Sequence, residues 1–217
     1  MRTIWIVRHM HREDADNPNW PGQAPYPDDP DLSPLGHAQA QQLAQFFAER
    51  PLDYIFCSPF LRALSTAQPV ARLKKLPIHV EPGLSESLTR EFFPVAPQLH
   101  DPATLRQRFP EIDPDYQPLY VPQYPEEGLA AMARAGQVAL ALVQRFPGNL
   151  LLVGHGASVW GATWGLLPQK PEIHCDFGAL VEITETPNGW QLQKAGVTDY
   201  LVGALSQSYP ANYGVRP

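Results

Sequence analysis

The sequence predicts an α/β fold, a three-layer α/β/α sandwich in which a mostly parallel sheet carries helices on both faces. Short apolar runs typical of buried strands alternate along the chain with amphipathic segments of helical length. A chain of 217 residues with 44% hydrophobic content can bury one substantial core. We therefore expect a single domain over residues 1–217.

The elements follow in order from the amino terminus. The first strand is predicted from Thr3 to Arg8, and Ser33-Pro34 then begins a helix to about Arg50, as an N-cap followed by a first-turn proline. The remaining expected elements are strand Tyr54 to Cys57, helix Phe60 to Lys74, strand Ile78 to Val80, helix Glu126 to Arg145, strand Leu150 to Val153, helix Ser158 to Leu166, and strands Leu180 to Thr184 and Trp190 to Lys194. The step Asn188-Gly189 favours a tight hairpin turn between the last two strands.

Two long loops are rich in proline. The chain has 25 prolines, and many of them lie in residues 17–33 and 94–125, so neither segment can be a continuous helix or a central strand. Both loops also carry aromatic side chains, which disfavour disorder. We expect them to form ordered lids over an active site.

Charge and composition exclude several classes of protein. The formal net charge of −6 and the pI of about 5.6 argue against binding nucleic acid or an anionic membrane through bulk electrostatics. No stretch approaches the roughly 18 apolar residues of a membrane span, and the amino terminus does not resemble a signal peptide. Cys57 and Cys175 are too few to form a metal framework. The chain is expected to be cytoplasmic.

Two strands of the predicted sheet each end in a histidine. His9 follows the first strand directly after Arg8, and His155 follows the strand Leu150 to Val153. Because ligands bind beyond the carboxyl ends of strands in open α/β sheets, we expect both imidazoles to face one reacting group. Other polar residues expected near the same edge are Arg12, the segment Ser58 to Arg62, and Glu86.

These residue types suit chemistry on a phosphate ester. Guanidinium groups present a planar fork that matches phosphate oxygens and keep their charge at physiological pH. A neutral imidazole can attack phosphorus, while a carboxylic acid can protonate the departing oxygen and later help to activate water. The sequence therefore favours phosphoryl transfer through a histidine.

Three segments resemble the signatures of the histidine phosphatase superfamily. They are Arg8-His9, the run from Ser58 to Ala67, and Gly154-His155-Gly156, and the likeness extends in order from Thr3 to about Ile183. A closer likeness is to the phosphatase domains of suppressor-of-T-cell-receptor-signalling proteins and to insect ecdysteroid-phosphate phosphatases. It rests on Arg12, on Val80 to Glu86 and on Ile112 to Tyr116.

The resemblance implies a phosphoglycerate-mutase-like fold and a metal-independent phosphomonoester hydrolase that works through a phosphohistidine. It implies that His9 is the nucleophile and that Glu86 is the proton donor. It further implies that Arg8, Arg62 and His155 bind the transferred phosphoryl group, with Arg12 adding a contact. No metal or organic cofactor is implied, and the substrate is expected to be a small-molecule or protein phosphomonoester.

The sequence departs from the superfamily pattern at Met10, where glycine is usual, and at Ser87, where the closer relatives carry a bulky aromatic residue. The Met10 side chain either crowds the phosphate or points away into the core, because adjacent residues of an extended segment face opposite sides. If it crowds the phosphate, the chain would be a catalytically silent phosphate-ligand binding module of the same fold. A phosphoglycerate mutase is less favoured, because residues 94–125 lack the additional arginine and tyrosine cluster for a second acidic group.

A metal-dependent hydrolase built on His9 and His11 is a further alternative. No other ligand cluster accompanies this His-x-His pair, and the neighbouring arginines would repel a cation, so we expect His11 at the surface or rim. We also expect Trp20, Tyr26, Tyr116 and Tyr120 to line a leaving-group pocket for aromatic or bulky apolar alcohols. The sequence leaves open the oligomeric state, a dimer included, and the role of residues 206–217.

Overall fold

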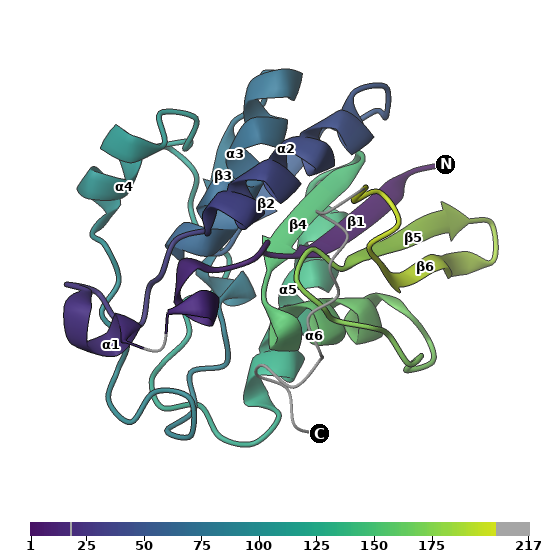
Figure 1. The fold of residues 1–217 in the computed structure, drawn as a ribbon. Helices are drawn as coiled ribbons and strands as arrows, with labels where there is room; N and C mark the ends of the chain where they lie inside the picture. The colour runs from purple at the N-terminus through teal and green to yellow at the C-terminus, as the bar shows by residue number, and fades with distance from the viewer. Residues whose placement is uncertain (18, 203–217) are drawn as a thin grey trace.

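A six-stranded sheet runs through the centre of the computed structural model, which describes residues 1–17 and 19–202 (Figure 1). Its strand order is β3-β2-β4-β1-β5-β6, with parallel pairing from β3 to β1 and antiparallel pairing of β1 with β5 and of β5 with β6. The strands are β1 (Thr3–Arg8), β2 (Tyr54–Cys57), β3 (Ile78–Val80), β4 (Leu150–Gly154), β5 (Leu180–Thr186) and β6 (Gly189–Val197). The expected α/β class with a mostly parallel sheet is confirmed.

Helices cover both faces of this sheet. The long helices are α2 (Pro34–Phe47), α3 (Leu61–Lys74), α5 (Ala130–Arg145) and α6 (Gly156–Leu166). Side chains alternate along β1, so Trp5 and Val7 pack with α2 and α3 on one face. Ile4 and Ile6 pack with α5 and α6 on the other face. The sheet therefore separates two apolar clusters, which gives the three layers.

Two helices begin at residues other than those expected. The α5 helix begins at Ala130 and not at Glu126. Gly128 has a left-handed backbone angle of φ +51°, and a regular right-handed helix cannot include such a residue. The α6 helix begins two residues earlier than expected, since His155 and Ser158 form a reciprocal capping box. The prediction for α2 holds at its start, where the Ser33 side chain accepts a hydrogen bond from the Gly36 N–H.

Short helices interrupt the proline-rich loops. Residues 17–33 contain α1 (Trp20–Gln23), and residues 94–125 contain α4 (Pro102–Arg108), whose N-cap Asp101 accepts backbone hydrogen bonds. Single turns of 3-10 helix, η1 (Glu13–Asp16) and η2 (Pro82–Leu84), follow β1 and β3. None of these was predicted, because each is too short to show helical periodicity. Residue 18 and the tail 203–217 lie outside the described residues.

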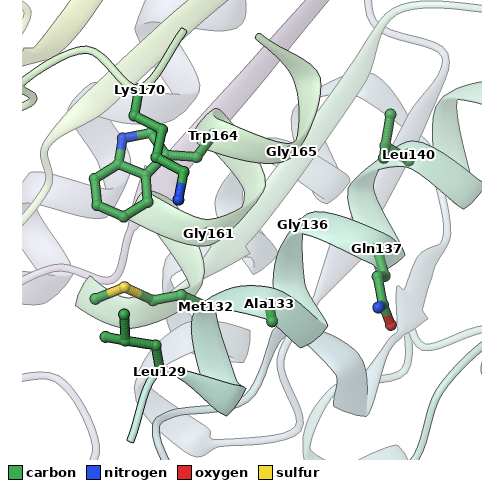
Figure 2. A pocket seen from close by; sticks show the side chains of 10 residues that line it. All are labelled: Leu129, Met132, Ala133, Gly136, Gln137, Leu140, Gly161, Trp164, Gly165 and Lys170. Carbon is green, nitrogen blue, oxygen red and sulfur yellow. The ribbon is translucent and has the colours of Figure 1, made fainter. Parts of the chain in front are cut away.

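Helices α5 and α6 approach each other closely at glycines. A Cβ atom at Gly161 would lie 2.2 Å from the Met132 carbonyl oxygen, so only glycine fits there. Beside this contact, Leu129, Met132 and Trp164 border an apolar groove of about 290 Å³ (Figure 2). Within the described residues, none of the helices combines the length and apolar character needed to cross a bilayer.

Met10 points into the core. Its side chain is fully buried and belongs to the apolar cluster between the sheet and helices α2 and α3. Its backbone N–H donates to Thr66 Oγ1 at 3.0 Å, and a Cβ at Gly178 would lie 2.9 Å from its sulfur atom. Of the two orientations that the sequence allowed, the structure has the one that leaves His9 uncrowded.

Truncating Met10 should therefore cost stability. We expect Met10→Ala to lower the free energy of unfolding by about 2–5 kcal/mol, the range for large-to-small changes in a core. Met10→Leu, which nearly conserves volume, should cost less than about 1.5 kcal/mol. Urea denaturation monitored by circular dichroism measures both changes. An Ala variant as stable as the natural protein would contradict the buried position.

Candidate active site

The site begins with the parallel pairing of β1 and β4. Arg8 lies opposite Gly154 in the register, and the His9 N–H donates to the Gly154 carbonyl oxygen at 2.9 Å. His9 and His155 are therefore the first residues beyond two neighbouring strand ends. Their ring centroids lie 5.2 Å apart, although 146 positions separate them in the sequence. The expected convergence of these two histidines is present.

The ring of His9 is fixed in one tautomer. Its Nδ1 lies 2.8 Å from the Met10 carbonyl oxygen, which can only accept a hydrogen bond, so we assign the ring proton to Nδ1. Nε2 is buried, has no hydrogen-bond partner, and keeps its lone pair. Burial, followed by the charge of Arg62, holds the pKa of His9 well below its usual value, which keeps the ring neutral.

The ring of His155 is held by a hydrogen bond with Ser58. Its Nε2 lies 2.8 Å from Ser58 Oγ, which also accepts the Phe60 N–H at 3.4 Å. The serine hydroxyl can donate to Nε2 or accept from it, according to the tautomer of the ring. Burial and then the charge of Arg62 hold the pKa of His155 well below its usual value. Nδ1 is the atom that faces Glu86.

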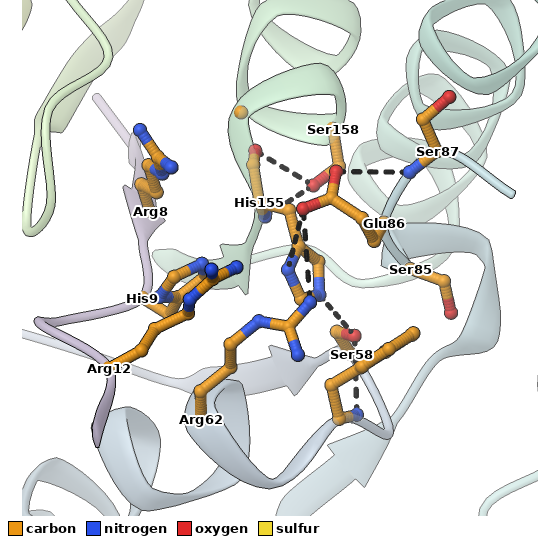
Figure 3. A network of polar contacts seen from close by, with 12 residues as sticks. Arg8, His9, Arg12, Ser58, Arg62, Ser85, Glu86, Ser87, His155 and Ser158 are labelled. Atoms are coloured by element: carbon orange, nitrogen blue, oxygen red, sulfur yellow. Dashed lines mark hydrogen bonds and ion pairs between the residues drawn. The ribbon is translucent and has the colours of Figure 1, made fainter. Parts of the chain in front are cut away.

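Arginine side chains surround the two imidazoles (Figure 3). Arg8, Arg12 and Arg62 border one cavity of about 280 Å³. Arg8 donates to the Cys175 carbonyl oxygen, and Arg12 Nη2 donates to Asp14 Oδ2 at 2.8 Å. Burial, more than the charge of Arg12, lowers the pKa of Arg62 to about 10, so this guanidinium stays charged at neutral pH. The cavity thus concentrates positive charge.

Glu86 borders the same cavity at the end of the segment that follows β3. Its Oε2 lies 3.5 Å from His155 Nδ1 and 3.8 Å from Arg62 Nη2, and its Oε1 accepts the Ser87 N–H at 3.0 Å. A ring nitrogen of His9, a ring nitrogen of His155 and a Glu86 oxygen all lie within 4.8 Å of one another. All six predicted site residues therefore meet at one edge of the sheet.

The walls of the cavity differ from those expected. Pro27, Asp28 and Pro30 come from the first proline-rich loop, whereas Phe92 and Phe93 precede the second. None of the four aromatic residues predicted for a leaving-group pocket is among the residues that border the cavity. Trp20 Nε1 donates instead to the Pro27 carbonyl oxygen, and the Tyr116 hydroxyl donates to the buried Glu81. The predicted placement of these four side chains at the cavity was wrong, and the preference for aromatic or bulky apolar alcohols stays a prediction.

Asp29 connects both loops to the helix that carries Arg62. The side chain of Phe60, the N-cap residue of α3, cannot accept a hydrogen bond, and the buried Asp29 Oδ1 accepts the Leu61 N–H at 2.8 Å. Asp29 Oδ2 lies 3.2 Å from Nδ1 of His100 in the second loop. Sequence reasoning missed Asp29, because a cap supplied from 32 positions away leaves no local pattern.

His11 does not lie at the surface or rim. Its side chain is fully buried, with Nδ1 2.8 Å from Ser33 Oγ, so that prediction was wrong. Ser33, which caps α2, thus also forms a hydrogen bond with the buried His11 ring. Among the described residues, the histidine and carboxylate group with the spacing of metal ligands is His9, Glu86 and His155, and it does not include His11. The arginines beside this group favour an anion over a cation.

The depressed histidine pKa values predict a loss of stability in acid. Unfolded histidines bind protons near pH 6.5, while buried His9 and His155 resist protonation in the folded protein. The free energy of unfolding should fall as pH drops below about 6.5, with a slope of up to about 1.4 kcal/mol per pH unit for each histidine. Urea denaturation at several pH values measures the slope.

The variants His9→Asn and His155→Asn should each flatten that slope. His37→Asn is the matched control, because the His37 side chain is 53% exposed. Equal slopes in all four proteins would show that these two rings are not the groups that resist protonation.

Known proteins resemble this chain in sequence over part of their length. The human ubiquitin-associated and SH3 domain-containing protein A is 29% identical over 168 residues, which cover 72% of this chain and 25% of that protein. The transcription factor tau 55 kDa subunit of Saccharomyces cerevisiae is 35% identical over 106 residues, 45% of this chain and 23% of that protein. The chain thus spans about a quarter of the length of these two relatives.

Solved structures share the fold. The ecdysone phosphate phosphatase of Bombix mori, in complex with tungstate, superposes with a TM-score of 0.76 at 21% identity, covering 89% of this chain and 92% of that one. A mycobacterial glucosyl-3-phosphoglycerate phosphatase superposes with a TM-score of 0.64 at 20% identity, covering 91% of this chain and 100% of that one. The sequence profile of the histidine phosphatase superfamily (branch 1) matches residues 4–198. Because this match spans most of the chain, the protein belongs to the histidine phosphatase superfamily.

Proposed function

We propose that this protein hydrolyses phosphomonoesters through a phosphohistidine on His9. The observation that carries the proposal is the state of the His9 ring, which is neutral, buried and held with Nε2 unpartnered beside three arginines. A neutral imidazole nitrogen with a free lone pair is a nucleophile. The surrounding guanidinium groups supply the charge that a phosphate dianion requires.

In the first step, His9 Nε2 forms a bond to phosphorus while the bond from phosphorus to the ester oxygen breaks. Glu86 in its acid form transfers a proton to that oxygen, so the leaving group departs as an alcohol. In the second step, the Glu86 carboxylate takes a proton from water, whose oxygen attacks phosphorus and displaces His9. Inorganic phosphate is released, and Glu86 is again protonated.

The three arginines and His155 would hold the transferred phosphoryl group. Arg8 and Arg62 are almost completely buried, and a desolvated charge acts more strongly than one in water. In the tautomer that carries its proton on Nδ1, His155 would donate one hydrogen bond. The amino terminus of α6 follows His155 directly and adds the positive end of the helix dipole to the same place.

The proline-rich loops 17–33 and 94–125 are proposed as lids of this site. The first loop supplies a wall of the cavity, and the second contacts the first where His100 meets Asp29. The proposed substrate is a small-molecule or protein phosphomonoester, and the proposed reaction uses no metal or cofactor. The cytoplasmic location stays a prediction.

The alternative of a silent binding module depended on Met10 crowding the phosphate. The burial of Met10 in the core opposes that reason and supports an active enzyme. Mutase activity has no comparable support, because the arginines that border the cavity are Arg8, Arg12 and Arg62, all of which are already assigned to one phosphoryl group.

Hydrolysis of para-nitrophenyl phosphate in the presence of a chelator tests the proposal. We expect turnover by the natural protein and a loss of at least about a thousandfold in His9→Ala, because the nucleophile is removed. His37→Ala, which changes an exposed histidine, should retain activity. Rapid quenching followed by peptide mapping should locate phosphate on His9. Phosphate trapped on another residue, or activity lost with the chelator, would refute the mechanism.

A further inference from the structure

We infer that Arg134 on α5 is a positioning residue that holds the proposed proton donor Glu86 at the phosphate cavity. Arg134 contacts the backbone of the segment that carries Glu86 and does not border the cavity itself. The inference rests on the proposed function, because it takes Glu86 as the acid. No sequence motif indicated a role for Arg134 in the reaction.

The guanidinium of Arg134 donates to three backbone carbonyl oxygens within residues 83–86. Nη1 donates to the Gly83 carbonyl oxygen at 2.8 Å and to the Ser85 carbonyl oxygen at 3.2 Å. Nη2 donates to the carbonyl oxygen of Glu86 itself at 3.0 Å. Arg134 is only 3% exposed, so water offers these carbonyl groups little alternative.

A buried carboxylate fixes the guanidinium in turn. Arg134 Nε lies 2.7 Å from Glu126 Oε1 and Nη2 lies 2.8 Å from Glu126 Oε2, a bidentate pair. Glu126 Oε2 also accepts the Leu88 N–H at 3.0 Å. The pair therefore binds the chain on both sides of Glu86 and leaves the guanidinium charge balanced.

The Glu86 side chain has few contacts of its own. Its carboxylate accepts one hydrogen bond from the adjacent Ser87 N–H, and its distances to His155 and Arg62 exceed ordinary hydrogen-bond length. The position of this carboxylate consequently depends on its backbone. Lysine could not replace Arg134 here, because an ammonium group lacks the planar fork that spans several acceptors at fixed angles.

Leaving-group dependence separates this role from general support of the fold. A general acid matters most when the departing oxygen is a strong base, and a displaced acid loses that contribution selectively. Damage to the phosphate cavity would instead slow all esters alike. An alkyl phosphate and para-nitrophenyl phosphate, whose leaving group is a much weaker base, provide the comparison.

The experiment measures kcat and KM of Arg134→Lys for both esters. We expect kcat for the alkyl ester to fall by about 10- to 100-fold and kcat for the aryl ester by less than about threefold, with KM little changed. Glu86→Gln should show the same selectivity to a greater degree. Arg145→Lys is the matched control, since it makes the same change on the same helix at an exposed residue and should alter neither rate.

Equal losses on both esters, or no loss in a folded Arg134→Lys protein, would overturn the positioning role. If Glu86→Gln shows no leaving-group selectivity, the acid assignment in the proposed function fails and the inference fails with it. If thermal melting shows that Arg134→Lys does not fold, Glu126→Gln takes its place. That variant keeps one oxygen acceptor for Arg134 and should show the same leaving-group selectivity to a smaller degree. Equal losses of kcat on both esters in Glu126→Gln would overturn the inference.

Discussion

The parallel pairing of β1 with β4 is the interaction on which the site depends. The hydrogen bond from the His9 N–H to the Gly154 carbonyl oxygen sets the register at the strand ends, and a slip of one residue would turn every side chain of β1 to the opposite face. That slip would exchange His9 with its buried neighbour Met10. The two imidazoles can therefore meet only in this register, which the two apolar clusters on either face of the sheet enforce.

The cavity contains buried positive charge. Arg8 and Arg62 are both desolvated at the cavity, and burying a charge is unfavourable unless it is paired. Near Arg62, the Glu86 Oε2 atom lies 3.8 Å from Nη2, which is longer than a close ion pair, and the Asp28 carbonyl oxygen accepts from Nη1 at 3.5 Å. A bound dianion in the cavity would lie close to both guanidinium groups. The buried positive charge of the cavity thus favours an anionic ligand.

Much of the fold and the central site followed from the sequence. Apolar runs ending in Arg8-His9 and Gly154-His155 locate two strand ends. Because the carboxyl ends of parallel strands lie at one edge of a sheet, the convergence of the two histidines could be predicted from local sequence patterns alone. Ser33-Pro34 likewise located the start of α2, because capping is a local interaction.

The predictions failed where long-range contacts decide the outcome. His11 is buried because it hydrogen-bonds to Ser33, and no local pattern carries that contact. Phe92 and Phe93 border the cavity in place of the predicted tyrosines, because the path of an irregular loop depends on its tertiary contacts. Arg134 reads in sequence as an ordinary helical arginine, and its partners on the backbone at Gly83 and Glu86 appear only in three dimensions.

The cap that Asp29 provides to α3 restricts how the first proline-rich loop can move. Releasing Asp29 would leave the Leu61 N–H unsatisfied at the start of the helix that carries Arg62. It would also separate the loop from His100. Asp29 therefore attaches the first loop to α3 at one point, between Asp28 and Pro30 of the cavity wall. A movement of the first loop that keeps this cap would be confined to the residues on either side of Asp29.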